Sequence, residues 1–148
     1  MLFGKRRREE NQYYIEALQG IKNELLSLGQ LYEKASRQPV QKHIKKLCIS
    51  TDKILRELMD NRKLIHKLGT FSGYYLPETV GIVRQYVKIK QNSAPGAQEQ
   101  ELIEKIEAFM PFAEKAFDDV LQSLTLPEAR GCGTDIDVLI EELGRFAR

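Results

Sequence analysis

Two aspartates near the carboxyl end, Asp135 and Asp137, have the spacing of phosphatases in which one carboxylate attacks phosphorus and a second handles the proton. Such a pair must stand just beyond a buried strand. Here it follows the glycine-containing run 130–134, which is typical of a loop. Thr134 and Asp137 also match a helix capping box, so capping is the favoured interpretation and the catalytic pair is the alternative.

The cysteines and histidines do not complete a reactive set. Cys132 lies between two glycines, but the arginine that would clamp a phosphate six positions later is replaced by Val138. Cys48 is expected to be a small buried hydrophobic residue. His43 and His66 stand among lysines without a carboxylate placed as a co-ligand, so no metal site and no cofactor is predicted.

Basic residues are the stronger candidates for an interaction. Lys5, Arg6, Arg7 and Arg8 follow an apolar start, as is typical of the cytoplasmic side of a membrane contact. There each basic residue adds about 1 kcal/mol of attraction to an anionic leaflet. A solvated, frayed terminus explains the same run equally well.

Three further lysines, Lys42, Lys45 and Lys46, either extend this basic surface or occupy an exposed helix face. No aromatic residues are interleaved with the lysines as a stacking platform, so nucleic acid is not expected as a partner. The predicted partner is an anionic membrane surface or another protein.

Composition indicates a single helical domain over residues 1–148. With 42% hydrophobic and 30% charged residues, a chain of 148 residues is expected to build one core. Two distant cysteines indicate no disulfide framework, and no apolar run approaches the roughly 20 residues that span a bilayer. The predicted location is the cytoplasm, with a peripheral contact at the inner face of the membrane as a further expectation.

The net charge of +2 conceals a division along the chain. Residues 34–67 hold ten lysines or arginines against three aspartates or glutamates, a balance of +7, whereas residues 93–148 hold five against twelve, a balance of −7. The sequence therefore divides into a basic helical hairpin over about 9–68 and, from the YYLP segment onward, an acidic helical half over about 70–148. The two parts should attract each other, and the acidic half can screen the basic surface.

Apolar spacing predicts the first two helices. One long helix is expected along Tyr14, Leu18, Ile21, Leu25, Leu28 and Tyr32, which alternate intervals of four and three. A second begins near Pro39 and carries the longest seam, which consists of Val40, Ile44, Leu47, Thr51, Ile54, Leu58, Asn61, Ile65 and Leu68. The polar Thr51 and Asn61 are expected to fix its register. Gly69 and Gly73, with caps at 70 and 72, are predicted to end it with a short break.

The remaining elements are predicted to be helical as well. A third helix passes through Tyr86, a flexible loop follows at 92–96, and a fourth helix from Leu102 to Val120 is kinked by Pro111 or divided there into two. After a loop over 125–133, a last helix ends near Phe146. The predicted fold class is all-α, an antiparallel bundle of four to five helices with long coiled-coil-like first and second helices. Such seams also permit a homo-oligomer.

The segment between the second and third helices has the most distinctive composition. Its residues are Phe71, Tyr74, Tyr75, Leu76, Pro77 and Thr79, followed by Tyr86 on the third helix. Aromatic residues at helical spacing usually belong to a core, so a packed corner is favoured over a ligand pocket. Truncation of Tyr74 is then expected to lower stability.

Together with the amphipathic stretch 103–121 and the closing run 135–139, this segment resembles the XpaC-like family of 5-bromo-4-chloroindolyl phosphate hydrolysis proteins. The resemblance is clearest in the second half of the chain. It implies a bacterial protein linked to hydrolysis of a chromogenic phosphate ester, in a family with some members beside genes for tellurite or toxic-anion resistance. Longer members carry amino-terminal membrane segments that are not expected here, and the run Lys5 to Arg8 would correspond to such a junction.

Two functions from different classes follow. The first is a non-enzymatic helical adaptor that binds a membrane surface or an acidic partner, linked to envelope or toxic-anion stress. The second, implied by the resemblance, is a phosphoric-ester hydrolase acting on 5-bromo-4-chloroindolyl phosphate near the two aspartates or near Tyr74 and Tyr75. In its metal-assisted version the ligands would be Asp135, Asp137, Glu141 and Glu142.

Overall fold

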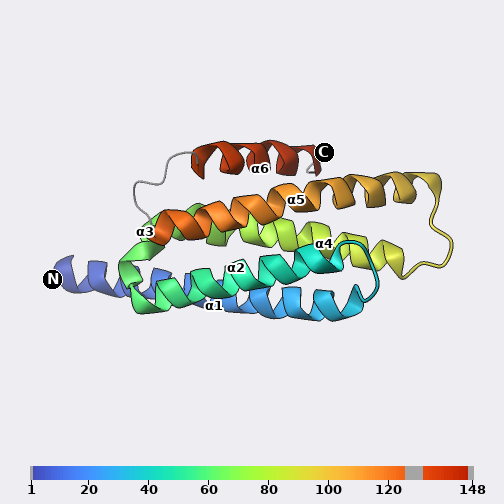
Figure 1. Cartoon of the computed structure of the whole chain (residues 1–148). Helices are drawn as coiled ribbons and strands as arrows, with labels where there is room; N and C mark the ends of the chain where they lie inside the picture. The colour runs from blue at the N-terminus through green and yellow to red at the C-terminus, as the bar shows by residue number, and fades with distance from the viewer. Residues whose placement is uncertain (1, 126–131, 147–148) are drawn as a thin grey trace.

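A computed structural model describes residues 2–125 and 132–146, and of residues 2–3 and 132–137 it describes the helical backbone alone. These described residues contain no strand and confirm the all-α prediction. Figure 1 shows the five long helices α1 (Leu2–Lys34), α2 (Gln41–Asp60), α4 (Leu76–Lys90), α5 (Ala97–Thr125) and α6 (Cys132–Phe146). Between α2 and α4 lie the 3₁₀ turn η1 (Arg62–Leu64), the short helix α3 (Ile65–Thr70) and the π-helix η2 (Phe71–Tyr75).

Four of the long helices enclose the core as a ring. α1 contacts α2 and α4, and α5 closes the ring by contacting the same two helices. α1 and α2 run in opposite directions, as do α4 and α5, because a turn joins the two helices of each pair (Figure 1). α6 lies outside the ring and crosses α5 on the side of the bundle away from α1.

The core is formed by the seams that apolar spacing predicts. Its fully buried members include Ile21 and Leu28 of α1, Ile44, Leu47, Ile54 and Leu58 of α2, Val80, Val83 and Tyr86 of α4, and Ile106, Ala113, Ala116 and Phe117 of α5. Thr51, the polar residue predicted within the α2 seam, is also fully buried. The Phe71 ring meets Phe117 edge-on with 5.2 Å between centroids, which ties the π-helix to α5.

The chain breaks after the second helix at Asn61, not at the glycines. Asn61 is exposed and extended, with φ −142° and ψ 96°, and its Oδ1 accepts a hydrogen bond from the backbone N–H of Lys63 at 3.2 Å. The prediction that Asn61 fixes the register from within the seam is therefore wrong. Its short amide side chain instead caps the next turn, as asparagine does at helix starts.

The predicted end at Gly69 and Gly73 is also wrong, because the chain stays helical from α3 through the π-helix into α4. A glycine weakens a helix by only about 1 kcal/mol relative to alanine. The burial of Phe71 and Tyr75, which are 2% and 7% exposed, outweighs that cost.

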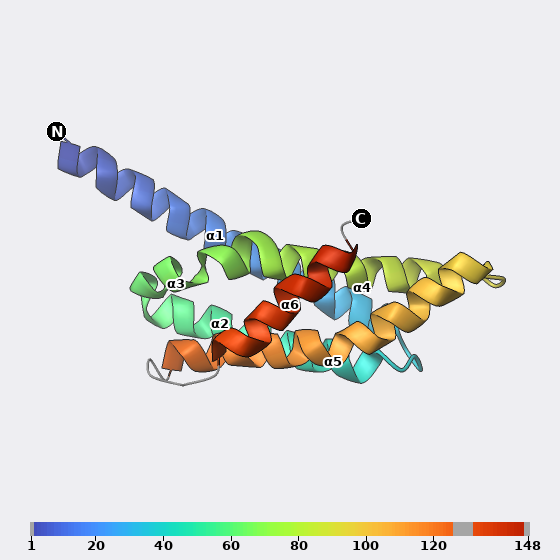
Figure 2. The ribbon, with the colours of Figure 1, turned by 90° about the horizontal axis from the view of Figure 1, so that it is seen from above.

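Pro111 lies inside α5 without dividing it. The alternative of two short helices is wrong, whereas Figure 2 shows that α5 bends along its course. The proline is exposed, and its buried neighbours Met110 and Ala113 hold the helix against the core. α6 begins at Cys132, ahead of the predicted cap at Thr134. The loop expected over 125–133 falls mainly on 126–131, outside the described residues.

The first turns of α1 project from one end of the bundle (Figure 2). Every residue from 4 to 13 is exposed. Among the described helices, none is both long and apolar enough to cross a bilayer.

Candidate functional site

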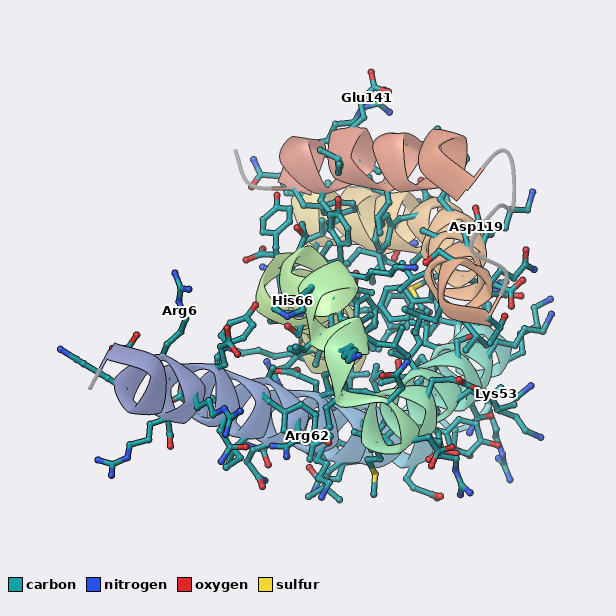
Figure 3. All side chains as sticks on the ribbon, turned by 90° about the vertical axis from the view of Figure 1, so that its left-hand side faces the viewer. Arg6, Lys53, Arg62, His66, Asp119 and Glu141 are labelled. Atoms are coloured by element: carbon teal, nitrogen blue, oxygen red, sulfur yellow. The ribbon has the colours of Figure 1, made fainter. Side chains whose placement is uncertain are left out.

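A groove lies at the end of the bundle from which α1 projects. Its lining consists of Arg7, Arg8, Glu10, Asn11, Tyr13 and Tyr14 of α1, together with Arg62, Lys63, Ile65 and His66 of η1 and α3. We call it the basic groove, and its volume is about 530 Å³. Figure 3 looks onto this end of the molecule, where the labelled Arg6, Arg62 and His66 come from neighbouring elements.

The helix break at Asn61 creates the groove. Because α2 ends at Asp60 and the chain turns through η1, Arg62 and Lys63 do not continue along α2 but line the groove opposite the amino-terminal part of α1. The Arg62 side chain reaches Asn11, which is 51 positions away in the sequence. A local change in backbone direction therefore brings two distant basic segments together.

Arg62 is held in place from two sides. Its guanidinium carbon lies 4.3 Å from the centroid of the Tyr14 ring, and its Nη2 donates a hydrogen bond to Oδ1 of Asn11. Both contacts restrict a long side chain that would otherwise lose rotamer freedom on binding a ligand. Arg62 is therefore positioned before a ligand arrives.

The basic groove has an excess of positive charge. Among the described residues of its lining, the strong bases are Arg7, Arg8, Arg62 and Lys63, whereas the one carboxylate is that of Glu10. The ion pairs found within residues 2–125 and 138–146 involve other side chains. Unpaired arginines and lysines that converge in a concave surface attract and bind anions.

The Tyr13 side chain, which lines the groove, packs closely against Gly69. A Cβ at position 69 would lie 2.9 Å from the hydroxyl oxygen of Tyr13, so the phenol lies directly against the backbone of α3. Tyr13 as a whole remains 47% exposed. The absence of a side chain at Gly69 therefore serves this close approach rather than the helix end that was predicted.

The described residues of the groove supply hydrogen-bond donors and positive charge. Within the described residues no hydrogen bond joins His66 to Glu10 or to a tyrosine of the groove. A guanidinium and an ammonium supply donors and charge, but they do not accept a proton near neutral pH.

The predicted basic residues lie at two separate ends of the molecule. Arg7 and Arg8 line the groove, and Lys5 and Arg6 lie on the exposed turns of α1 beside it. The lysines Lys42, Lys45 and Lys46 open α2 near the other end of α1, roughly 40 Å away at 1.5 Å of rise per residue. The two sets therefore do not form one continuous surface.

The distinctive segment around the π-helix lies outside the groove lining. Phe71, Tyr75, Leu76, Thr79 and Tyr86 are buried, Pro77 is half-buried, and Tyr74 is 38% exposed. The Tyr74 ring stands edge-on to Tyr75 with 5.7 Å between centroids. Burial, with a smaller contribution from the charge of Glu107, raises the pKa of Tyr86 to about 12.

A family model described as 5-bromo-4-chloroindolyl phosphate hydrolysis protein matches residues 5–139. The chain belongs to this family. The match confirms the resemblance and extends it to the first half of the chain, so that every residue of the basic groove falls within it. No curated protein and no solved structure matches the chain.

Asp135 and Asp137 are the residues that the sequence offers as the catalytic alternative. Their side chains lie outside the described residues. The helix that carries them, α6, crosses α5 away from α1, and none of its described side chains lines the basic groove. Of the other two carboxylates in the metal hypothesis, Glu141 is exposed (Figure 3), and Glu142 accepts a hydrogen bond from Arg145 at 2.9 Å. Within the described residues, no three metal-ligating side chains converge.

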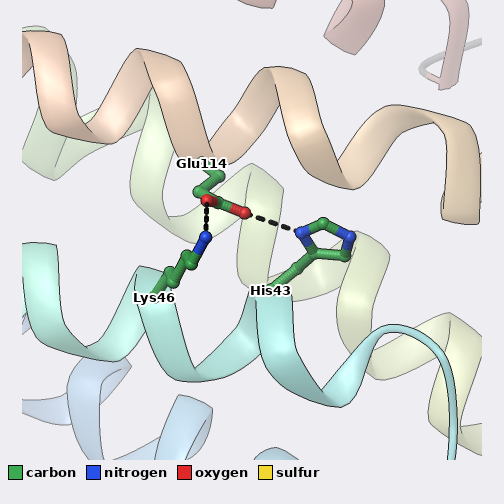
Figure 4. A network of polar contacts seen from close by, with 3 residues as sticks. All are labelled: His43, Lys46 and Glu114. Atoms are coloured by element: carbon green, nitrogen blue, oxygen red, sulfur yellow. Dashed lines mark hydrogen bonds and ion pairs between the residues drawn. The ribbon is translucent and has the colours of Figure 1, made fainter.

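A second polar cluster, which sequence spacing did not predict, joins α2 to α5. Nδ1 of His43 donates to Oε2 of Glu114 at 2.6 Å, and Nζ of Lys46 donates to Oε1 at 2.9 Å (Figure 4). Burial alone would raise the pKa of Glu114, but the hydrogen bonds and charges of His43 and Lys46 outweigh it and lower the pKa. The two donors lie three positions apart, whereas their acceptor lies 71 positions from His43. Residue spacing along the sequence therefore places His43 and Lys46 on one helix face, but it does not identify Glu114 as their acceptor.

Sequence reasoning also missed the half of the groove on η1 and α3. Arg62 and Lys63 entered only the charge balance of the basic half, His66 was considered only as a metal ligand, and Tyr13 was not considered. The available signal was Asn61, whose position directly before two basic residues marks a helix break that presents them at an exposed end.

Proposed function

We propose that this protein is a non-catalytic binding protein that docks on an anionic membrane surface. The docking region is its basic end, defined as Lys5 to Arg8 of α1 together with the basic groove. The observation that carries the proposal is the convergence of Arg7 and Arg8 with Arg62 and Lys63 at one exposed end, where none of them has a carboxylate partner among the described residues.

Shape and charge both favour a surface as the ligand. The projecting turns of α1 bring their cations to a flat surface ahead of the bundle (Figure 2). Each cation within a Debye length of about 8 Å contributes about 1 kcal/mol. Tyr13 and Ile15, which are 47% and 48% exposed, supply apolar contact at the depth of the headgroups. Glu9 and Glu10 reduce the positive charge of this end but do not cancel it.

Co-sedimentation with vesicles tests the proposal. Binding is expected to vesicles of phosphatidylcholine mixed with phosphatidylglycerol, and not to phosphatidylcholine alone. It should weaken as salt rises, because the contacts are exposed. Removal of two cations in the variant Lys5→Gln, Arg6→Gln should weaken binding about 30-fold, from about 1 kcal/mol per charge.

The matched control removes the same charge from the other end of the molecule. The variant Lys42→Gln, Lys45→Gln changes two exposed lysines of α2 and is expected to bind like the parent protein. Equal losses in both variants would show attraction by net charge alone and would overturn docking by the basic end. Binding that is indifferent to salt would overturn it as well.

The family match favours one second candidate, a phosphoric-ester hydrolase. The test is hydrolysis of 5-bromo-4-chloroindolyl phosphate by the purified chain with and without added divalent metal. Activity that is lost in the variant Asp135→Asn, Asp137→Asn would establish a catalytic site on α6. Absence of activity in both proteins would leave binding as the function that the basic groove supports.

A further inference from the structure

The basic groove has a more specific geometry than a diffuse basic surface. Arg62 is fixed by the Tyr14 ring at 4.3 Å and by its hydrogen bond to Asn11, which occupies one N–H of the guanidinium. Its remaining donors have no partner among the described residues. A guanidinium fork of this kind donates two parallel hydrogen bonds to oxygens of one phosphate group.

The cations around Arg62 also lack partners. Arg7, Arg8 and Lys63 line the same groove, so a bound anion would reduce their mutual repulsion. Elsewhere in the bundle, Lys46 pairs with Glu114 and Arg56 pairs with Asp52, each at 2.9 Å. The groove therefore gathers four strong bases that have no carboxylate partner among the described residues.

We infer that the basic groove binds the phosphate monoester of a membrane lipid headgroup and so selects such lipids from others of equal surface charge. The inference rests on the proposed function. A phosphate monoester carries a charge of about −1.5 to −2 near neutral pH and three acceptor oxygens. A phosphodiester such as that of phosphatidylglycerol carries a single charge, so it satisfies fewer of the four strong bases.

The concave shape favours a terminal phosphate as well. A phosphate at the tip of a headgroup can enter a groove of about 530 Å³, whereas the diester of phosphatidylglycerol lies beneath its own glycerol group. The rings of Tyr13 and Tyr14 form one wall beside the cations. Glu10 is the carboxylate among the described groove residues and opposes an anion, so a ligand that fits must approach the arginines rather than this carboxylate.

Vesicles of matched surface charge test the inference. Phosphatidic acid supplies the monoester and phosphatidylglycerol the diester, each mixed into phosphatidylcholine until the two zeta potentials agree. The full chain is expected to bind the phosphatidic acid vesicles about tenfold more tightly, the factor of one charge-assisted hydrogen bond. Arg62→Lys keeps the charge but removes the fork, so it should lose this preference and bind phosphatidylglycerol vesicles as before.

Arg56→Lys is the matched control, because Arg56 is an exposed arginine of α2 that is paired with Asp52 outside the groove. It should keep the full preference, and circular dichroism should show both variants folded. Equal binding of the two vesicles by the parent chain would overturn the inference and leave the proposed function standing. Binding to neither vesicle would remove both.

A third experiment distinguishes a lipid headgroup from a soluble molecule as the source of the phosphate monoester. Calorimetry with glycerol 3-phosphate, without vesicles, is expected to show only weak binding, because the projecting turns of α1 then contribute nothing. Binding of glycerol 3-phosphate as tight as that of phosphatidic acid vesicles would assign the groove to a soluble ester and overturn the lipid assignment. Preference retained in Arg62→Lys would overturn the role of Arg62.

Discussion

Glu114 is the residue at which the basic and acidic parts of the chain meet inside the bundle. Its carboxylate is 21% exposed and accepts from both His43 and Lys46, so each oxygen has a cationic or polar donor. By contrast, the pair between Arg56 and Asp52 is exposed on both sides, at 75% and 43%. Partial burial makes the first contact stronger, because water and salt screen the second.

Glu114→Gln is expected to lower the free energy of unfolding by about 1–2 kcal/mol at pH 7, since a charged acceptor of two hydrogen bonds is replaced by a neutral amide. Asp52→Asn, the matched control at the exposed pair, should cost less than about 0.5 kcal/mol. Urea denaturation followed by circular dichroism measures both. Equal costs would show that the α2–α5 cluster is no stronger than a surface pair.

The same variant has a pH signature whose sign follows from the lowered pKa of Glu114. The carboxyl has a lower pKa in the folded chain than the usual value of 4.5, so its contribution to stability is present above pH 4.5 and is lost as pH falls through the folded pKa. The difference in stability between the parent protein and Glu114→Gln should therefore shrink below pH 4.5. A difference that stays constant down to about pH 3 would contradict the assignment of the shift to this contact.

At the scale of elements, apolar periodicity predicted where the helices bury their seams. Val40, Ile44 and Leu58 of the predicted second seam are all buried, and Leu68 remains on the core side although it belongs to α3. Apolar periodicity did not reveal the break at Asn61, because the apolar residues Ile65 and Leu68 after the 3₁₀ turn also face the core. Propensity failed at Pro111 and Gly69 because buried neighbours outweigh a local preference of a few kcal/mol.

The candidate site was less accessible to sequence reasoning than the fold. Lys5 to Arg8 were identified because they form a run, but the other half of the groove consists of single residues on a turn. Arg62 and Asn11 are 51 positions apart, so no local pattern joins them. A site assembled from two such segments becomes visible only when the backbone direction at Asn61 is known.

α6 offers a test of element packing, because it lies outside the helical ring. Leu139 is fully buried and Leu143 is 3% exposed, while the Phe146 ring stands edge-on to Phe109 at 5.2 Å. Leu139→Ala should cost about 2–5 kcal/mol, the usual loss for a buried leucine, and limited proteolysis should then cut α6 before the other helices. Ile140→Ala is the matched control, since Ile140 is 43% exposed and its loss should cost less than about 0.5 kcal/mol. Similar losses in both variants would contradict the packing of α6 through Leu139.

At the scale of the whole molecule, the basic residues lie at two different ends of the bundle, and only one of these ends contacts the acidic helix α5. The lysines that open α2 lie beside the acidic helix α5, and one of them, Lys46, is neutralised there by Glu114. The basic end lies at the far end of α1, with its arginines unpaired among the described residues. An ion pair between the two halves therefore lies within the bundle, whereas none of the ion pairs among the described residues involves the basic end.

This arrangement predicts how the molecule is oriented on a membrane. Residues 4–13 are all exposed, and a helical segment of that length is marginal with so little tertiary packing, so their amides should exchange with deuterium fastest among the described helices. Ile44 to Leu58 of α2 belong to the core and should exchange slowly. Anionic vesicles are expected to slow exchange in residues 4–13 and to leave the first turn of α2 unchanged, because that turn lies roughly 40 Å away along α1. Protection of the α2 turn without protection of 4–13 would mean that the molecule binds by its other end.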